Sequence, residues 1–188
     1  KSTAAMTMGS LVHCAVLEPS ELSKRYGIAP DRRTRRGKES AAAMQASGIE
    51  PVSESDLQQA QRMASAVRRH PMAVELLQQG QPETSIWWDD AETGLRCKCR
   101  PDWINGSTCV DLKTTTDASP KGFAKSVAGF RYHVQAAHYL AAGLFDRFVF
   151  IAVEKEAPFA VGVYALDADA LSEGQRLRDR DLQRIANC

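Results

Sequence analysis

Residues 95–115 read LRCKCRPDWINGSTCVDLKTT, and this stretch decides the fold. Asn105-Gly106 is a strong hairpin signal, because both residue types accept the positive φ angles of a two-residue turn. The residues on either side of the turn have the side chains typical of strands. The stretch therefore predicts a β-hairpin made of residues 95–104 and 108–115.

Three charged side chains of this hairpin converge. Asp111 and Lys113 are two residues apart on a strand, so their side chains leave the same face, while Val110 and Leu112 point to the other face. The turn folds Asp102 back towards Asp111. Two carboxylates beside an ammonium group suit a hard divalent cation, since Mg²⁺ is typically held by one or two carboxylates together with a substrate phosphate.

Such a cation would lower the pKa of a bound water and neutralise charge that develops on a phosphorus atom. Lys113 can position that water and stabilise the same charge without binding the cation. The plainer alternative is a surface ion pair between Asp111 and Lys113. The burial that Val110 and Leu112 require favours a partly enclosed polar pocket over this alternative.

The rest of the chain predicts an α/β fold with a mixed sheet and helices packed on it. Apolar periodicity and capping residues define the helices, and short apolar runs define the strands. Helices are expected at residues 4–17, 56–69 (capped by Asp56), 71–79 and 132–144 and after Asp167, and further strands at residues 84–88, 147–153 and 159–166. Residues 18–55 read as irregular and polar. The Arg/Asp-rich face of the last helix is expected to be exposed to water.

The length and composition suit one globular domain spanning residues 1–188, because 44% of the residues are hydrophobic. No apolar run is long enough to span a bilayer, and the first residues lack the apolar core of a signal peptide. The cysteines are odd in number and form no regular framework, which favours reduced thiols in a cytosolic protein. They are Cys14, Cys97, Cys99, Cys109 and Cys188.

The formal net charge of +1 hides one basic segment between Lys24 and Lys38. This segment holds seven basic residues and a single acid, Asp31, so the rest of the chain is net negative. A concentrated basic segment can hold a phosphate backbone while an acidic metal site lies elsewhere. A solvated loop explains the composition equally well. On the first interpretation, Arg32 and Arg33 contact the substrate.

The motifs of the chain resemble those of the PD-(D/E)XK nucleases, in particular the exonuclease VIII (RecE-like) branch. Pro101-Asp102, eight intervening residues and Asp111-Leu112-Lys113 form the signature. The other matching motifs are Gly9-Ser10-Leu11-Val12-His13, Leu17-Glu18-Pro19, Asp31-Arg32-Arg33-Thr34, residues 132–139 (YHVQAAHY) and residues 148–154 (FVFIAVE). The resemblance covers nearly the whole chain and implies a restriction-endonuclease-like core. Relatives usually continue beyond the first and last helices, so both ends look trimmed.

The resemblance also implies a role for individual residues. The implied catalytic residues are Asp102, Asp111, Lys113 and Glu83. The implied metal ligands are His13, Asp102, Asp111 and the backbone carbonyl of Leu112. The implied substrate-binding residues are Gln135 and Tyr139, which match the Q-x-x-x-Y motif of RecB-type nucleases, and Thr114, to which the basic segment adds Arg32 and Arg33.

Each of these roles has a plainer alternative. Without the resemblance, His13 beside an apolar Val12 is a core histidine. Glu83 is equally an exposed residue at the start of the first strand. Gln135 and Tyr139 share a helix face because they are four residues apart, but a tyrosine on an amphipathic helix is ordinarily a core residue. Strand propensity explains Thr114 as well as phosphate binding does.

The activity implied by the resemblance is Mg²⁺-dependent hydrolysis of DNA from duplex ends, with Mn²⁺ able to substitute for Mg²⁺. Degradation would run 5′ to 3′ and leave a 3′ overhang for a single-strand annealing recombination protein. The resemblance further implies a ring-shaped tetramer around DNA, in the cytoplasm of a bacterium and encoded by the bacterium or a prophage.

Three other interpretations stay open on the sequence alone. The first is another nuclease of the same fold, such as an endonuclease or an enzyme that acts on RNA. The second is a DNA-binding module without catalysis. The third is a zinc protein built on histidines together with Cys97 and Cys99, which lie on the same face of a predicted strand.

Overall fold

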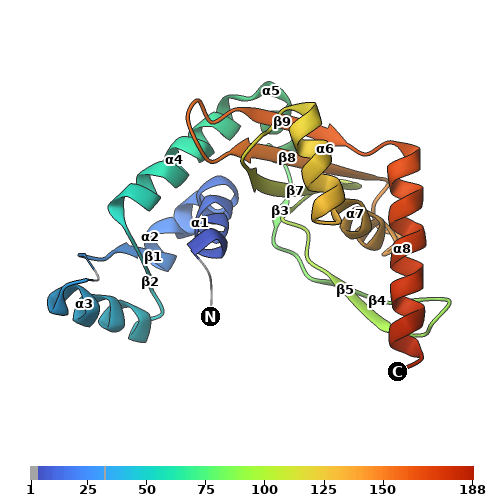
Figure 1. Cartoon of the computed structure of the whole chain (residues 1–188), viewed down its shortest axis with the longest axis horizontal. Helices are drawn as coiled ribbons and strands as arrows, with labels where there is room; N and C mark the ends of the chain where they lie inside the picture. Colours follow the sequence, from blue (N-terminus) through green and yellow to red (C-terminus); the bar gives the residue numbers. More distant parts are fainter. Residues whose placement is uncertain (1–3, 32) are drawn as a thin grey trace. The chain divides into compact units, whose positions relative to one another are not determined.

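The computed structural model describes residues 4–31 and 33–188, and the chain divides into two compact units after Arg69 (Figure 1). The N-terminal unit is mainly helical. Its elements are α1 (Ala4–Leu17), η1 (Pro19–Glu21), α2 (Leu22–Arg25), β1 (Tyr26–Ile28), α3 (Arg35–Ala46), β2 (Glu50–Val52) and α4 (Glu54–Arg69).

The core of this unit lies where α1 packs on α4. The apolar stripe of α1 contributes Leu11 and Val12, and that of α4 contributes Met63 and Val67, all of them fully buried. The Arg68 guanidinium donates a hydrogen bond to the carbonyl of Ala15 at 2.9 Å. The helix predicted at residues 4–17 is confirmed.

The prediction that residues 18–55 are irregular is wrong. Two three-residue strands, β1 and β2, pair in parallel although they lie more than twenty residues apart, and no local pattern signals such a pairing. Helix α3 was missed because its residues are good helix formers without an apolar stripe, and Thr34 caps it by accepting from the Gly37 amide at 3.0 Å. Helix α4 begins earlier than predicted, and Ser53 rather than Asp56 caps it, through a 3.0 Å bond from the Asp56 amide.

The C-terminal unit is built on a five-stranded sheet with the order β3-β6-β7-β8-β9. The strands are β3 (Gln81–Pro82), β6 (Trp103–Asn105), β7 (Thr108–Thr115), β8 (Arg147–Glu154) and β9 (Val161–Ala165). Strands β7 and β8 are parallel and the other neighbours antiparallel. The helices of the unit are α5 (Pro71–Leu77), α6 (Pro120–Gly129), α7 (Tyr132–Leu140) and α8 (Ala168–Ala186) (Figure 1). The predicted mixed sheet flanked by helices is confirmed.

A parallel strand pair needs a crossover connection, and α6 and α7 supply it between β7 and β8. The core between these helices and the sheet is aromatic, with the Phe123 ring stacked on Tyr164 at 4.9 Å and edge-on to Phe150 at 5.6 Å. Cys109 of β7 joins this core and is fully buried. Asp111 and Lys113, which alternate with it, therefore leave β7 on the face covered by α6 and α7.

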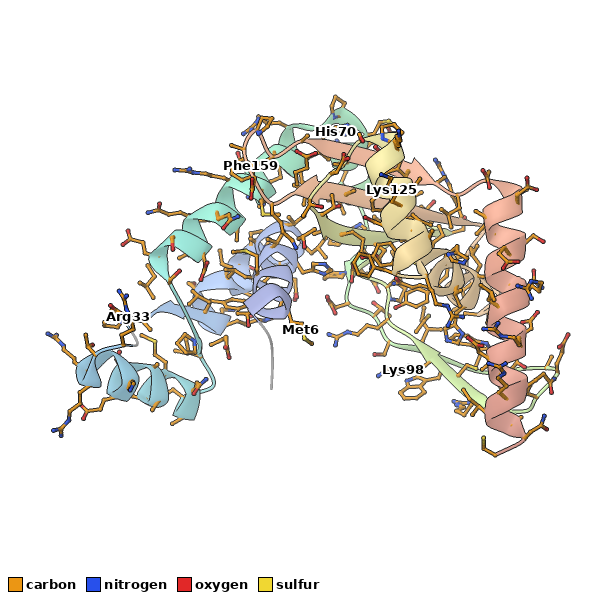
Figure 2. All side chains as sticks on the ribbon, in the orientation of Figure 1. Met6, Arg33, His70, Lys98, Lys125 and Phe159 are labelled. Carbon is orange, nitrogen blue, oxygen red and sulfur yellow. The ribbon has the colours of Figure 1, made fainter. Side chains whose placement is uncertain are left out.

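The predicted hairpin forms around Gly106, whose φ is +56°. Strand β7 has the predicted bounds, but the strand predicted at residues 95–104 breaks at residues 100–102. Pro101 lacks the amide that a continuous ladder needs, so the chain leaves one sheet and enters another there. The first part, β5 (Arg96–Cys99), pairs instead with β4 (Ile86–Asp89) as a separate two-stranded ribbon, on which Lys98 is exposed (Figure 2).

Helices α7 and α8 approach each other closely at Gly174, where a Cβ atom would lie 2.2 Å from the His133 carbonyl oxygen. The Asp167 side chain caps α8 as predicted, by accepting from the Ala170 amide at 2.8 Å. Within residues 4–31 and 33–188, no helix is both long and apolar enough to cross a lipid bilayer.

Candidate active site

Asp111 is the centre of the candidate site and is almost fully buried, with 2% of its surface exposed. The Gln135 side-chain amide donates to Asp111 Oδ1 at 2.5 Å. The Lys113 ammonium lies 2.6 Å from Asp111 Oδ2. Both carboxylate oxygens thus have charged or amide partners, which offsets the cost of burying the charge. The prediction that Asp111 and Lys113 share a face is confirmed.

Asp102 is tied directly to the strand that carries Asp111. Strands β6 and β7 pair Trp103 with Val110, and one further step along this antiparallel register sets Asp102 opposite Asp111. The Asp102 carboxylate accepts a hydrogen bond from the Leu112 amide at 2.7 Å. The predicted return of Asp102 towards Asp111 is therefore confirmed, and the break in the strand lets the Asp102 side chain turn towards β7.

Glu83 lies between β3 and β4, not at the start of a strand as the sequence suggested, and its φ of +54° is left-handed. Its amide donates to the Asp102 carbonyl at 3.1 Å. Carboxylate oxygens of Glu83 and Asp102 lie within 4.8 Å of each other. Such a backbone conformation is uncommon outside glycine and is found where the surroundings impose it, often at functional sites.

Arg100 is a residue of this site that sequence reasoning did not assign. Its guanidinium lies 2.7 Å from Glu83 Oε2 and donates to the Glu83 carbonyl at 3.1 Å. It therefore fixes both the side chain and the backbone of Glu83. The signal in the sequence is its position directly before Pro101-Asp102. The strand breaks there, and the break places the Arg100 side chain beside Glu83.

Two tyrosines of α7 contact residues of the candidate site. The Lys113 ammonium lies 4.7 Å from the ring centroid of Tyr132, within the range of a cation–π contact. The Tyr139 hydroxyl donates to the Arg100 carbonyl at 3.4 Å. Burial raises the pKa of Tyr139 to about 12, so its phenol stays protonated at neutral pH and can act only as a neutral hydrogen-bonding group.

The donor set fits a hard divalent cation. Glu83 and Asp102 offer carboxylate oxygens at a spacing that one ion can bridge, and Mg²⁺ and Ca²⁺ prefer oxygen ligands. The roles of Asp111 and of the Leu112 carbonyl as further ligands stay predictions. His13 lies in α1 of the N-terminal unit beside the fully buried Val12 and is partly exposed, and its role as a ligand also stays a prediction.

The predicted substrate contacts are placed in different parts of the chain. Gln135 and Tyr139 face the candidate site, whereas Thr114 leaves β7 on the face opposite Asp111. Arg33 belongs to the N-terminal unit, is 91% exposed and pairs with Asp31 at 2.8 Å. Arg32 lies outside the described residues. None of these placements tests substrate binding, so the contacts stay predictions.

Among the described residues, the side chains that lie close enough together to hold one metal ion include no cysteine. Cys97, Cys99 and Cys109 are buried thiols, and Cys99 and Cys109 belong to the aromatic core. Burial raises the pKa of Cys99 to about 11 and raises the pKa of Cys109 further. Burial therefore favours the neutral thiol over the thiolate, which is the form that binds zinc.

Residues 1–188 match the family model described as "PDDEXK-like domain of unknown function (DUF3799)". Among solved structures, a candidate exonuclease from Eubacterium rectale is similar, with a TM-score of 0.69 and 17% identity over 100% of this chain and 69% of that chain. At this identity the likeness concerns the fold alone. SSO0001 aligns with a TM-score of 0.41 and 16% identity over 94% of this chain and 85% of that chain, which carries no argument. No curated protein matches the chain.

Proposed function

The chain belongs to the family of PDDEXK-like domains, and from this premise we propose that it is a metal-dependent nuclease that hydrolyses DNA from duplex ends. The observation that carries the proposal is the buried Asp111, paired with Lys113 and set opposite Asp102 across β6 and β7. A surface ion pair would not need the Gln135 amide or the enclosed position.

The residues divide the chemistry among them. Glu83 and Asp102 would hold the divalent cation, with His13, Asp111 and the Leu112 carbonyl as further candidate ligands. When bound, a Mg²⁺ or Mn²⁺ ion supplies an activated water and neutralises charge on the phosphate. Lys113 carries a positive charge at a fixed place, with 18% of its side chain exposed, where it can stabilise the oxygens of the pentacovalent phosphorus.

Gln135 and Tyr132 also act on these catalytic groups themselves. The Gln135 amide fixes the orientation of the Asp111 carboxylate, and the Tyr132 ring contacts the Lys113 ammonium and limits its movement. Because these groups are in position before the reaction, no reorganisation energy is needed when charge develops on the phosphate. Such preorganisation is the usual source of electrostatic catalysis.

The finer features of the proposal rest on the resemblance of the motifs to the exonuclease VIII branch. They are a 5′ to 3′ direction, a 3′ overhang passed to a single-strand annealing protein in recombination, a ring-shaped tetramer, and a cytoplasmic location for an enzyme encoded by a bacterium or a phage.

End-labelled linear duplex DNA in Mg²⁺ tests the activity and its direction together. We expect stepwise loss of one strand from its 5′ end, no loss when Mg²⁺ is removed by a chelator, and recovery with Mn²⁺. Closed circular duplex DNA of the same sequence is the matched control and should stay intact. Cutting of the circle would identify an endonuclease, and binding to linear DNA without cleavage in either metal would identify a non-catalytic module.

The basic segment offers fewer residues for contact with the DNA backbone than its composition suggests. Lys24, Arg25, Arg33 and Arg35 are already paired with Glu21, Glu18, Asp31 and Glu39. Among the described residues of the segment, Arg36 and Lys38 are exposed near the start of α3 and form no ion pair.

Reversing the charge of Arg36 and Lys38 should therefore weaken DNA binding and flatten its dependence on salt. Each phosphate contact contributes about 0.9 to the slope of log K against log salt, so the double variant should lose roughly two units. Binding isotherms over a salt series measure the slope. Arg62→Glu, an exposed arginine on α4, is the control. An unchanged slope in the double variant would assign the segment to solvent or to a subunit contact.

A further inference from the structure

Phe130, between α6 and α7, exposes 71% of its surface, the largest fraction among the exposed large apolar side chains of the described residues. Single exposed apolar residues are common and by themselves identify nothing. The neighbours of this side chain distinguish it from the others, because they lead directly to the candidate active site.

The Phe130 ring stacks on Tyr132, with centroids 5.6 Å apart and planes inclined by 27°. Tyr132 in turn lies 4.7 Å from the Lys113 ammonium. On its inner side Tyr132 is supported by Phe123 and Phe150 at 6.2 and 5.8 Å. The exposed ring is thus the outermost member of an aromatic row that starts in the core and passes the lysine of the candidate site.

The backbone holds this ring in place. The Phe130 amide donates to the Ser126 carbonyl at 2.9 Å, at the end of α6. Arg131, the next residue, is left-handed with φ 58° and ψ 37°, and its guanidinium lies 2.5 Å from the Asp181 carboxylate of α8. This conformation is rare for a residue with a side chain, and the ion pair to a separate helix helps to maintain it.

We propose that Phe130 stacks on a nucleobase next to the phosphate bound at the candidate site. The ligand would be an unpaired base of the strand being cut, because a paired base inside a duplex offers no free face. Every base has such a face, so the contact would serve any sequence. The inference rests on the proposed function. It adds a contact that forms with DNA whose end is unpaired and does not form with a fully paired duplex.

The surroundings favour a polyanion with flat bases over a protein partner. The exposed ring is flanked by Gly129 and Arg131, and the partly buried ammonium of Lys113 contacts the ring of Tyr132. A single ring offers far less area than a specific protein interface buries. Stacking of one base on one ring needs only that area.

Binding of labelled oligonucleotides tests the contact apart from cleavage. The DNA is a duplex with a short unpaired 5′ end, in which each unpaired nucleotide in turn is made abasic. All proteins carry Lys113→Met, so that the DNA is retained in the presence of Mg²⁺. We expect Phe130→Ala to weaken binding of the complete DNA about tenfold, the usual effect of one lost base–aromatic stack. Phe130→Trp should restore it.

The abasic series identifies the base. At one position the abasic DNA should bind equally to the proteins with and without the Phe130→Ala substitution, because the stack is already absent. Ile185→Ala, which removes another exposed apolar side chain, should bind like the parent. A loss of affinity that is the same for complete DNA and every abasic DNA, or no loss at all, would overturn the stacking contact alone. Failure of both the folded Lys113→Met protein and the unsubstituted protein to bind any DNA would overturn the proposed function as well.

Discussion

Replacing Lys113 with methionine should reduce the rate of DNA cleavage by about 100-fold or more, while DNA binding is largely retained. The ammonium is held at 2.6 Å from Asp111 and beside Tyr132, so it is positioned before the substrate arrives. Removing one such preorganised group from a site where charge develops typically costs this much in rate. Single-turnover digestion of end-labelled DNA measures the loss, and an anisotropy titration measures binding.

Lys125→Met is the matched control, because Lys125 is an exposed lysine on α6 (Figure 2) and its loss should leave the rate unchanged. Thermal unfolding of both variants is needed, since Asp111 is buried and loses its cationic partner in the first. Lys113→Arg restores a positive charge and tests whether a lower rate reflects folding. Cleavage by a folded Lys113→Met protein at the wild-type rate would refute the role assigned to this residue.

Replacing Arg178 with alanine should destabilise the C-terminal unit by about 3–5 kcal/mol, the usual cost of breaking a buried ion pair from one side. The guanidinium is 10% exposed and contacts the Asp90 carboxylate, which is 8% exposed. Its other edge lies 2.6 Å from Asp179. Without it, the Asp90 charge stays buried with only Thr93 as a neutral partner. Chemical denaturation followed by far-UV circular dichroism measures the difference in unfolding free energy.

Arg176 provides the control on the same helix. Its pair with Glu173 is exposed, 63% and 48% respectively, so Arg176→Ala should cost less than about 1 kcal/mol. Replacing Arg178 and Asp90 together by apolar residues should recover much of the lost stability, because no charge is then left buried. A cost for Arg178→Ala as small as that for Arg176→Ala would show that water reaches Asp90.

The local parts of the fold were predictable from sequence. The Asn105-Gly106 turn and the alternation of the following residues are strong short-range signals, and they placed β7 with its true bounds. The same signals brought Asp102, Asp111 and Lys113 together. Helix α6 was also readable in principle, since Ser119-Pro120 is a capping pair and the Ser119 hydroxyl accepts from the Gly122 amide at 3.1 Å.

The parts that failed depend on residues far apart in the chain. The sequence predicts that Arg178 lies on a water-exposed helix face, because nothing near it signals that Asp90, which lies in a turn, is its partner. The division of residues 95–104 between two sheets likewise depends on which strand each half meets. The side-chain roles at the site, including those of His13 and Glu83, came from the resemblance and not from local patterns.

The hydrogen bond from the Leu112 amide to the Asp102 carboxylate makes the main chain of β7 a reporter of the site. The acceptor, Asp102, is also a predicted ligand of the cation. A cation bound to this carboxylate withdraws negative charge from it and therefore weakens the hydrogen bond from the Leu112 amide. In a nuclear magnetic resonance spectrum, the chemical shift of the Leu112 amide would therefore report metal occupancy directly, in the absence of DNA and of turnover.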